Sequence, residues 1–375
     1  MSSVISPRVS KGNAALPYGR ASDTVFKDTM NAAIERQIGN ARFQNALARR
    51  PQRTPPIWLM RQAGRYHHHY QALRAQHSFM DLCKQPELAA EVALGPVADF
   101  GFDAAILFSD LLFPLEALGM GLEYTDYGPQ LGWKLDENSI SRLQSVDDAW
   151  PHLLFQGDAI GATRERIPVD RSLIGFVGGP WTLFVYAVEG THKGSLTKSK
   201  HLLPLFSRFC ETMVPLLGRN IQLQLDHGAE VVMIFDTAAG ELSPQIFQSE
   251  VVPQLRELTE TNRSRIGYYS KGTQGAHLSD ALFTGDNLAG IGVDHTWDLR
   301  EAFQVSAGGF VQGNFDQTLL HATRDQLTKR LSDYLAPLRG REWPGWICGL
   351  GHGVLPGTPE DNVRLFVDTV REVMQ

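Results

Sequence analysis

The sequence alternates short apolar runs with longer stretches of helical pattern, and this alternation limits the fold more than any other feature. Eight runs are rich in β-branched and aromatic residues, as buried strands are. They lie at 57–59, 104–108, 173–176, 231–235, 265–269, 289–293, 310–312 and 346–349. Because parallel strands need long crossovers, which are usually helical, the pattern predicts a parallel sheet closed on itself, a single (β/α)8 TIM barrel.

The stretches between the runs carry signals for helix starts. Residues 40–48 and the stretch that follows Pro86 have apolar residues at helical spacing. Ser243 and Thr358 can each cap a helix that opens on the proline after them. The runner-up is an open, doubly wound sheet, which usually has a Gly-rich loop after its first strand; here residues 61–64 read RQAG.

Length and the absence of repeats indicate one main domain. The chain has 375 residues, which suits one barrel. We predict an N-terminal extension at 1–37 and the barrel at 38–375. The extension is basic and serine-rich with no acidic residue before Asp23, and a disordered tail is the favoured interpretation. An organelle transit peptide is the alternative.

Charge and cysteine content exclude several classes of partner. The net charge is −6 and the pI about 6.1, so no nucleic acid or anionic membrane is expected as a partner. The apolar runs are too short to span a bilayer. Three distant cysteines without a CxxC pair suggest reduced thiols in a cytoplasmic compartment, and no metal site is predicted.

Three arginines follow the first apolar run: Arg61, Arg65 and Arg74. Each guanidinium offers two parallel donors that fit one carboxylate. A single arginine there would more often pair with an acid on the surface. Three at the mouth of one strand favour an anionic ligand.

In a barrel the chemistry gathers where the strands end. The ends of the later runs carry a further set of polar residues: Asp110, Asp236, Thr237, Lys271, Asp294 and His352. Phe108, Phe176 and Phe235 stand one or two residues inside them. Together these side chains predict a pocket with apolar walls and convergent charges. Asp236 and Lys271 are interpreted as candidates for structural ion pairs.

Six segments resemble the uroporphyrinogen decarboxylase family, in the family's order. They are PPIWLMRQAGRY (55–66), ILFSDLL (106–112), GFVGGPWTLFVYAVEG (175–190), IFDTAAGELSP (234–244), VQGNFD (311–316) and GLGHGVLPGTPEDNV (349–363). The resemblance implies a (β/α)8 barrel, usually a homodimer. It also implies removal of carbon dioxide from the four acetate side chains of uroporphyrinogen III, giving coproporphyrinogen III in haem biosynthesis, without a cofactor.

The resemblance also assigns residues. Catalytic roles fall on Asp110, Arg61 and Tyr186. Contacts with the anionic tetrapyrrole fall on Arg61, Gln62, Ala63, Arg65, Arg74, Phe108, Asp110, Phe176, Tyr186, Phe235, Thr237 and His352. Taken alone, Asp110 would read as a helix cap and Tyr186 as a core aromatic. The proton donor stays open, because a guanidinium is a poor acid near neutral pH and a water or the reacting carboxyl can relay the proton.

The sequence departs from the family's pattern in three places. Residues 67–69 are three histidines, interpreted as solvated and only distantly as a metal site; Trp297 follows Asp294 at a wider spacing; and Gln317 replaces a common proline. A divergent member with another substrate is therefore an alternative. A corrinoid or thiol methyltransferase would need zinc ligands such as His-x-Cys, but Trp346 precedes Cys348 at that spacing. A non-catalytic polyanion binder would keep the arginines without Asp110.

Overall fold

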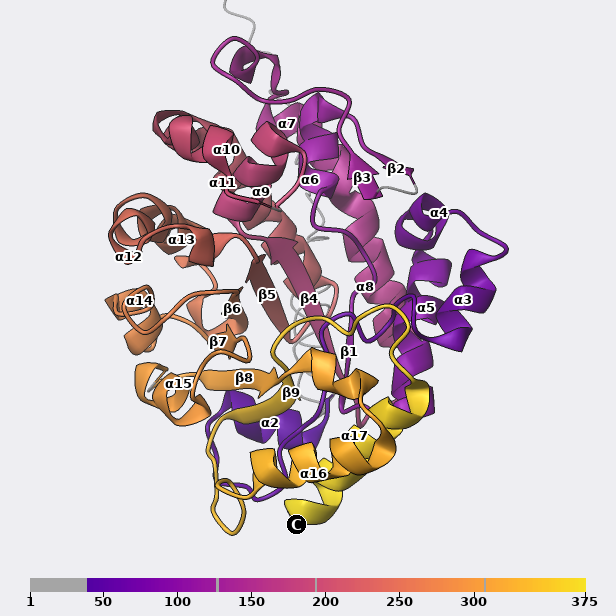
Figure 1. The fold of residues 1–375 in the computed structure, drawn as a ribbon. Coiled ribbons are helices and arrows are strands. Elements are labelled where there is room, and N and C mark those ends of the chain that lie inside the picture. Colours follow the sequence, from indigo (N-terminus) through magenta and orange to yellow (C-terminus); the bar gives the residue numbers. More distant parts are fainter. Residues whose placement is uncertain (1–38, 126–127, 193, 307) are drawn as a thin grey trace, which may run out of the picture. The chain divides into compact units, whose positions relative to one another are not determined.

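The computed structural model describes residues 39–375 except 126–127, 193 and 307. The predicted extension at 1–37 lies outside the described residues, so its boundary and character stay predictions. Figure 1 shows helices on the outer side of a curved central sheet. No helix in the described part of the chain is long and apolar enough to cross a membrane.

The central sheet has seven parallel strands in the order β1-β4-β5-β6-β7-β8-β9. The strands are β1 (Ala104–Ile106), β4 (Ser172–Gly178), β5 (Val231–Asp236), β6 (Ile266–Ser270), β7 (Gly290–Val293), β8 (Phe310–Phe315) and β9 (Trp346–Leu350). Every residue of these seven strands is buried, which explains why each reads as a continuous apolar run. A separate antiparallel hairpin joins β2 (Glu123–Thr125) and β3 (Gly128–Gln130).

The helices between the strands follow the predicted signals closely. They are α2 (Ala41–Leu47), α3 (His68–Arg74), α4 (Phe79–Lys84), α5 (Pro86–Phe100), α6 (Phe113–Leu115), α7 (Val146–Ala149), α8 (Leu154–Arg166), α9 (Pro180–Glu189), α10 (Thr197–His201), α11 (Leu203–Asp226), α12 (Pro244–Ile246), α13 (Val252–Thr259), α14 (Ala281–Thr284), α15 (Leu299–Val305), α16 (Arg324–Leu335) and α17 (Glu360–Val373). Ser243 caps α12 as expected, whereas α17 begins after Pro359 and is not capped by Thr358.

The first predicted strand, at 57–59, is not a strand. Ile57 forms only an isolated parallel bridge with Cys348 of β9. Its carbonyl accepts from Asp103 N at 2.9 Å, just before β1, so the segment lies between the two edge strands. Pro55 and Pro56 have no N–H to donate, and Ile57 N donates to the Asp103 side chain at 2.8 Å instead. A continuous ladder therefore does not form here.

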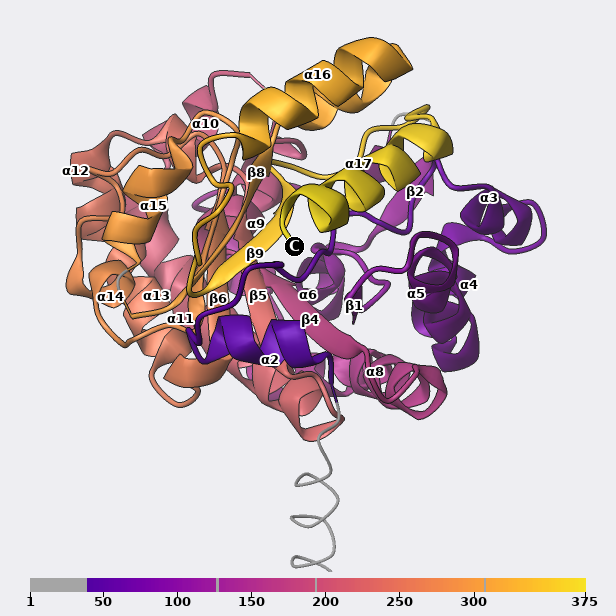
Figure 2. The same ribbon diagram turned by 90° about the horizontal axis from the view of Figure 1, so that it is seen from below.

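The start of the described chain is fixed at the amino ends of the strands. Asn40 caps α2, and its own N–H donates to Ser172 Oγ at 3.0 Å, where β4 begins. Its side-chain Nδ2 donates to Asp103 Oδ1 at 2.9 Å. Figure 2 shows α2 below the central strands. The opposite, carboxyl ends of the strands are left open for a site.

Candidate active site

A cavity of about 860 Å³, partly open to solvent, lies at the carboxyl ends of β1, β4, β5 and β9. Segments far apart in the sequence contribute to its wall. The lining residues are Met60, Arg61, Ala63, 106–112, Pro129, Phe176, Tyr186, Phe235, Thr237 and His352. Nine of the residues that the sequence predicts for a site are among them. The strand ends therefore converge as the sequence indicates.

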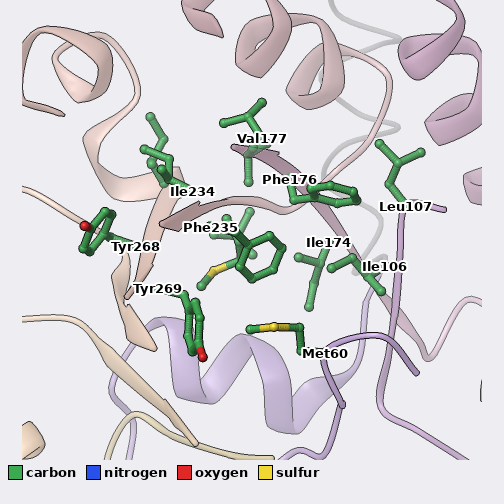
Figure 3. Close-up of a cluster of buried hydrophobic side chains, with 14 of the residues drawn as sticks. Met60, Ile106, Leu107, Ile174, Phe176, Val177, Ile234, Phe235, Tyr268 and Tyr269 are labelled. Atoms are coloured by element: carbon green, nitrogen blue, oxygen red, sulfur yellow. The ribbon is translucent and has the colours of Figure 1, made fainter. Parts of the chain in front are cut away.

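The cavity has an aromatic wall. The rings of Phe176 and Phe235, from neighbouring strands, have centroids 5.5 Å apart. Phe108 also lines the cavity, and its ring centroid lies 5.6 Å from that of Tyr70. Figure 3 shows Phe176 and Phe235 side by side, whereas Tyr268 points to the other face of its strand. Flat apolar walls of this kind suit a ligand with ring faces.

Among the residues that the structure describes, Asp110 is the one carboxylate in the cavity lining. Its Oδ1 accepts from Leu112 N at 2.9 Å, so the residue also makes the local turn that the cap interpretation predicted. Burial raises the pKa of Asp110; the Leu112 N–H, the Tyr124 hydroxyl and the charge of Arg61 lower it in part. A further hydrogen-bond donor or cation beside Asp110 would therefore stabilise its charged form.

Arg61 stands at the same cavity as an unpaired cation. Its φ is +59°, a left-handed conformation that is costly for a residue with a Cβ. Its side chain has no ion pair or hydrogen bond among the described residues. A Cβ on Gly353 would lie 2.4 Å from Arg61 Cδ, so only glycine leaves room for the arginine there. Strain and a missing partner together indicate that a ligand completes this group.

His352 lies beside Arg61 as a neutral imidazole. Tyr269 donates its hydroxyl proton to Gly351 O at 2.8 Å, so His352 Nδ1, 3.0 Å from that hydroxyl, carries a proton and donates it. Nε2 is then left as an acceptor. Burial, followed by the charges of Arg61, Lys271 and His192, lowers the pKa of His352 to about 3. His352 can therefore accept a ligand hydrogen bond without carrying charge at neutral pH.

Tyr186 reaches the cavity from α9. Its hydroxyl is hydrogen-bonded to Nδ1 of His192, six residues further on. Burial and the negative charge of Asp110 raise the pKa of Tyr186 to about 12, against a smaller opposite effect of Arg61. The phenol is therefore protonated at neutral pH.

Asp236 fixes the start of α9 and so the direction of that helix. Its Oδ1 accepts from Thr182 N at 3.2 Å and Thr182 Oγ1 at 2.5 Å, and its Oδ2 accepts from Tyr268 at 3.1 Å. A Cβ on Gly179 would lie 2.6 Å from Asp236 Cγ, so the approach needs glycine. The prediction that Asp236 and Lys271 are ion-pair candidates is wrong, because neither forms an ion pair among the described residues.

Replacing Asp236 by asparagine is expected to remove a pH dependence of stability. Burial raises the pKa of Asp236 from 3.8 to about 6 despite its hydrogen bonds. The folded state then binds more protons than the unfolded state between these values, so the stability contributed by this group is complete below about pH 4 and lost as pH rises through 6. Urea unfolding of both proteins at pH 4 to 7 measures the difference. Parallel stability curves would contradict this.

Three predicted contact residues are not in the cavity lining. Gln62 is buried, with Oε1 accepting from Leu59 N at 3.2 Å and Nε2 donating to Ala104 O at 3.0 Å, so it anchors the loop. Arg65 and Arg74 are exposed, and their charges favour the ionised form of Tyr70. Both arginines are therefore near Tyr70, whose ring packs against that of Phe108.

Sequence reasoning missed two residues near the site. The Tyr124 hydroxyl is buried and has no partner within hydrogen-bond distance among the described residues, yet it lies near enough to favour the charged form of Asp110. Tyr124 reaches Asp110 from the β2–β3 hairpin, whose Pro129 lines the cavity. His192 was missed because it precedes a Gly-rich turn that resembles any surface loop. Neither residue carries a local sequence signal.

The family departures lie outside the cavity lining. His67 is buried and its Nε2 is 2.7 Å from Asp99 Oδ2, so the prediction that all three histidines are solvated is wrong. His68 pairs with Glu360 and His69 with Glu91 O. The three histidines thus face separate partners. Among the described residues, no three His, Cys, Asp or Glu side chains are arranged to hold a metal ion.

Comparison with known proteins gives one consistent family. The family model described as uroporphyrinogen decarboxylase (URO-D) matches residues 39–373. The uroporphyrinogen decarboxylase of Myxococcus xanthus is 37% identical over 88% of this chain and 96% of that protein. The uroporphyrinogen decarboxylase of Pseudoalteromonas atlantica is 35% identical over 89% and 97%.

Solved structures support the fold alone. A methyltransferase from Methanosarcina mazei superposes with a TM-score of 0.67 at 21% identity, covering 89% of this chain and 98% of that one. A putative vitamin-B12-independent methionine synthase from Listeria monocytogenes has a TM-score of 0.50 at 12% identity, covering 86% and 98%. With the sequence matches and the arrangement of the cavity, the family is settled. The chain belongs to the uroporphyrinogen decarboxylase family.

Proposed function

We propose that this protein removes carbon dioxide from the four acetate side chains of uroporphyrinogen III and gives coproporphyrinogen III, without a cofactor. One observation carries the proposal: the half-buried Asp110 shares an aromatic cavity with Arg61, whose side chain has no partner among the described residues. A ligand with both a ring system and peripheral carboxylates fits that combination. Curated relatives that match nearly the whole of their own length bear the same enzyme name.

The carboxylate in the cavity matches what the decarboxylation requires. Loss of carbon dioxide from an acetate on a pyrrole needs a place for the bonding electrons. Protonation of the ring carbon that bears the acetate makes a cation that accepts them. Asp110 then accepts hydrogen bonds from the pyrrole N–H groups and stabilises the positive charge at the ring, in a cavity where few other groups screen it.

The remaining residues hold the rim of the substrate. Arg61 binds the carboxylate of the acetate or of a neighbouring side chain, and the neutral Nε2 of His352 and the hydroxyl of Thr237 assist it. Phe108, Phe176 and Phe235 line the faces of the ring. Ala63 N–H, which has no hydrogen bond among the described residues, is a further donor at the lining.

Two of the arginines lie further out. Arg65 and Arg74 are exposed beside Tyr70, and we assign them to carboxylates that project past Phe108. Gln62 supports this part of the chain from inside by its bonds to Leu59 and Ala104. Substrate contact by Arg65 and Arg74 is therefore expected to affect KM more than kcat.

The finer architecture is part of the proposal. We expect the segment at 57–59 to close the seven-stranded sheet into the (β/α)8 barrel of the family, since it bonds to both edges. We also expect the family's homodimer, which sedimentation of the purified protein measures. The three cysteines are buried and free, in keeping with a reducing, cytoplasmic compartment.

The second candidate is the corrinoid or thiol methyltransferase that the sequence leaves as an alternative. Such an enzyme would need the thiolate and imidazole ligands of a zinc site. Cys348 is buried in β9, and burial raises the pKa of its thiol. A thiolate ligand is not favoured in that setting, so the decarboxylase is the better supported function.

The deciding experiment is anaerobic incubation of the purified protein with uroporphyrinogen III. Mass spectrometry should find products that have lost one to four molecules of carbon dioxide. A matched incubation with heat-denatured protein controls for spontaneous loss. An unchanged substrate, at a protein concentration in the micromolar range, would contradict the proposed function.

A further inference from the structure

The end of α9 brings a histidine back onto the catalytic face. The helix stops at Glu189, and Gly190 adopts a left-handed conformation with φ of +77°. Gly190 N still donates to Tyr186 O at 2.8 Å, so the chain reverses there. His192 then lies beside Tyr186, with ring centroids 5.2 Å apart and Nδ1 bonded to the phenol.

His192 connects the buried phenol with the outside. Tyr186 lines the cavity, whereas His192 is absent from the lining and is half-exposed. His192 also lies near His352: after burial, its charge is among those, with Arg61 and Lys271, that lower the pKa of His352. On the cavity side, Asp110 and Arg61 act on Tyr186 with opposite signs. The pair Tyr186–His192 thus spans from solvent to the reaction cavity.

The other ionisable groups in the lining are poor proton donors. A guanidinium such as that of Arg61 holds its proton at any physiological pH. Asp110 is needed as an anion beside the ring. His352 is neutral, because its surroundings hold its pKa near 3. Tyr186 has a proton to give, and an adjacent imidazolium that replaces this proton as it leaves makes the phenol a usable acid.

We propose that His192 acts through Tyr186 as a positioning residue that supplies the proton for pyrrole protonation. The phenol O–H bond breaks and a C–H bond forms at the ring carbon, while the phenol oxygen takes the proton from Nδ1 of the imidazolium. The C–C bond to the carboxylate then breaks, its electrons neutralise the ring cation, and carbon dioxide leaves an exocyclic methylene. That methylene takes a proton from solvent and the ring carbon gives up the proton it received, which forms the methyl group and restores the pyrrole. Solvent returns one proton to the imidazole, which balances one proton consumed per carbon dioxide. This rests on the proposed function.

The test compares His192→Asn with wild type on uroporphyrinogen III across pH 5.5 to 9. Asparagine keeps a hydrogen-bonding group beside Tyr186 but cannot ionise. We expect kcat to fall about 100-fold, KM to change less than twofold, and the alkaline fall of kcat to disappear. In a Tyr186→Phe background the same change should cost nothing further, because the relay is already cut.

His201→Asn is the matched control, since His201 is exposed at the end of α10 and outside the cavity lining. It should retain wild-type kcat and pH profile. If His192→Asn also keeps both while wild type is active, the relay is overturned and the decarboxylase stands. If the wild-type protein releases no carbon dioxide, the proposed function is wrong, and the relay that rests on it is wrong as well. Thermal unfolding of each variant separates misfolding from loss of the relay; if His192→Asn unfolds, His192→Gln replaces it under the same criteria.

Discussion

Asp110→Asn is expected to lower kcat by about 100- to 1,000-fold with little change in KM, because the ring cation loses the carboxylate that lines the cavity beside it. The amide oxygen can still accept from Leu112 N, so the turn after β1 should survive. Steady-state kinetics with uroporphyrinogen III measures the effect. The fall in kcat/KM on the acid side should also vanish, since it reports protonation of this carboxyl.

The position of that acid limb is a second readout of the same variant. Burial raises the pKa of Asp110, so the wild-type limb should lie above the usual range of an aspartate. Asp280→Asn is a matched control: Asp280 accepts from Leu282 N at 2.8 Å in the same geometry, on a helix outside the cavity lining. Asp110→Asn with wild-type turnover would remove the cation-stabilising role.

Arg61→Ala should cost about 2–5 kcal/mol of transition-state stabilisation, because a substrate carboxylate in the cavity would lose its guanidinium partner. The free arginine has no protein partner among the described residues, so no buried acid is orphaned and the fold should be kept. The loss is measured as the ratio of kcat/KM for wild type and variant. Arg61→Lys should recover part of it, since it returns the charge without the planar pair of donors.

Arg324→Ala supplies the control for Arg61. Arg324 is exposed in the first turn of α16 and outside the cavity lining. Its removal should leave kcat/KM unchanged. Wild-type kinetics in Arg61→Ala would show that the arginine belongs to the surface and that the rim is held by other groups.

Seven of the eight predicted strands are present, because full burial makes each of them a continuous apolar run that a single sequence reveals. The eighth differs for a reason that lies elsewhere in the chain. Ile57 has the apolar pattern, but its N–H donates to the side chain of Asp103, which lies just before the edge strand β1. An apolar pattern indicates that a segment is buried. Burial alone does not decide which backbone N–H and C=O groups pair with a neighbouring strand.

The candidate site also includes residues that the sequence predicted correctly and residues that it did not. The residue types at the strand ends predicted Asp110, the three phenylalanines and His352, because parallel strands bring their carboxyl ends to one edge. Gln62 lies in the most specific motif, yet its side chain turns inward to Leu59 and Ala104. Adjacent residues of one motif can therefore have different roles, because a side chain that forms its hydrogen bonds in the core does not face the cavity.

The sequence by itself determined the alternating architecture, the end of the sheet where the cavity lies, and most of the cavity's side chains, since these depend on local pattern and strand direction. Tertiary structure decided which acid faces the cavity and which has its oxygens occupied by hydrogen bonds inside the protein. Asp110 is the first kind and Asp236 the second. It also decided that His192 meets Tyr186. Protonation and hydrogen-bond partners depend on groups that the folded chain brings together from distant positions, and no local pattern encodes them.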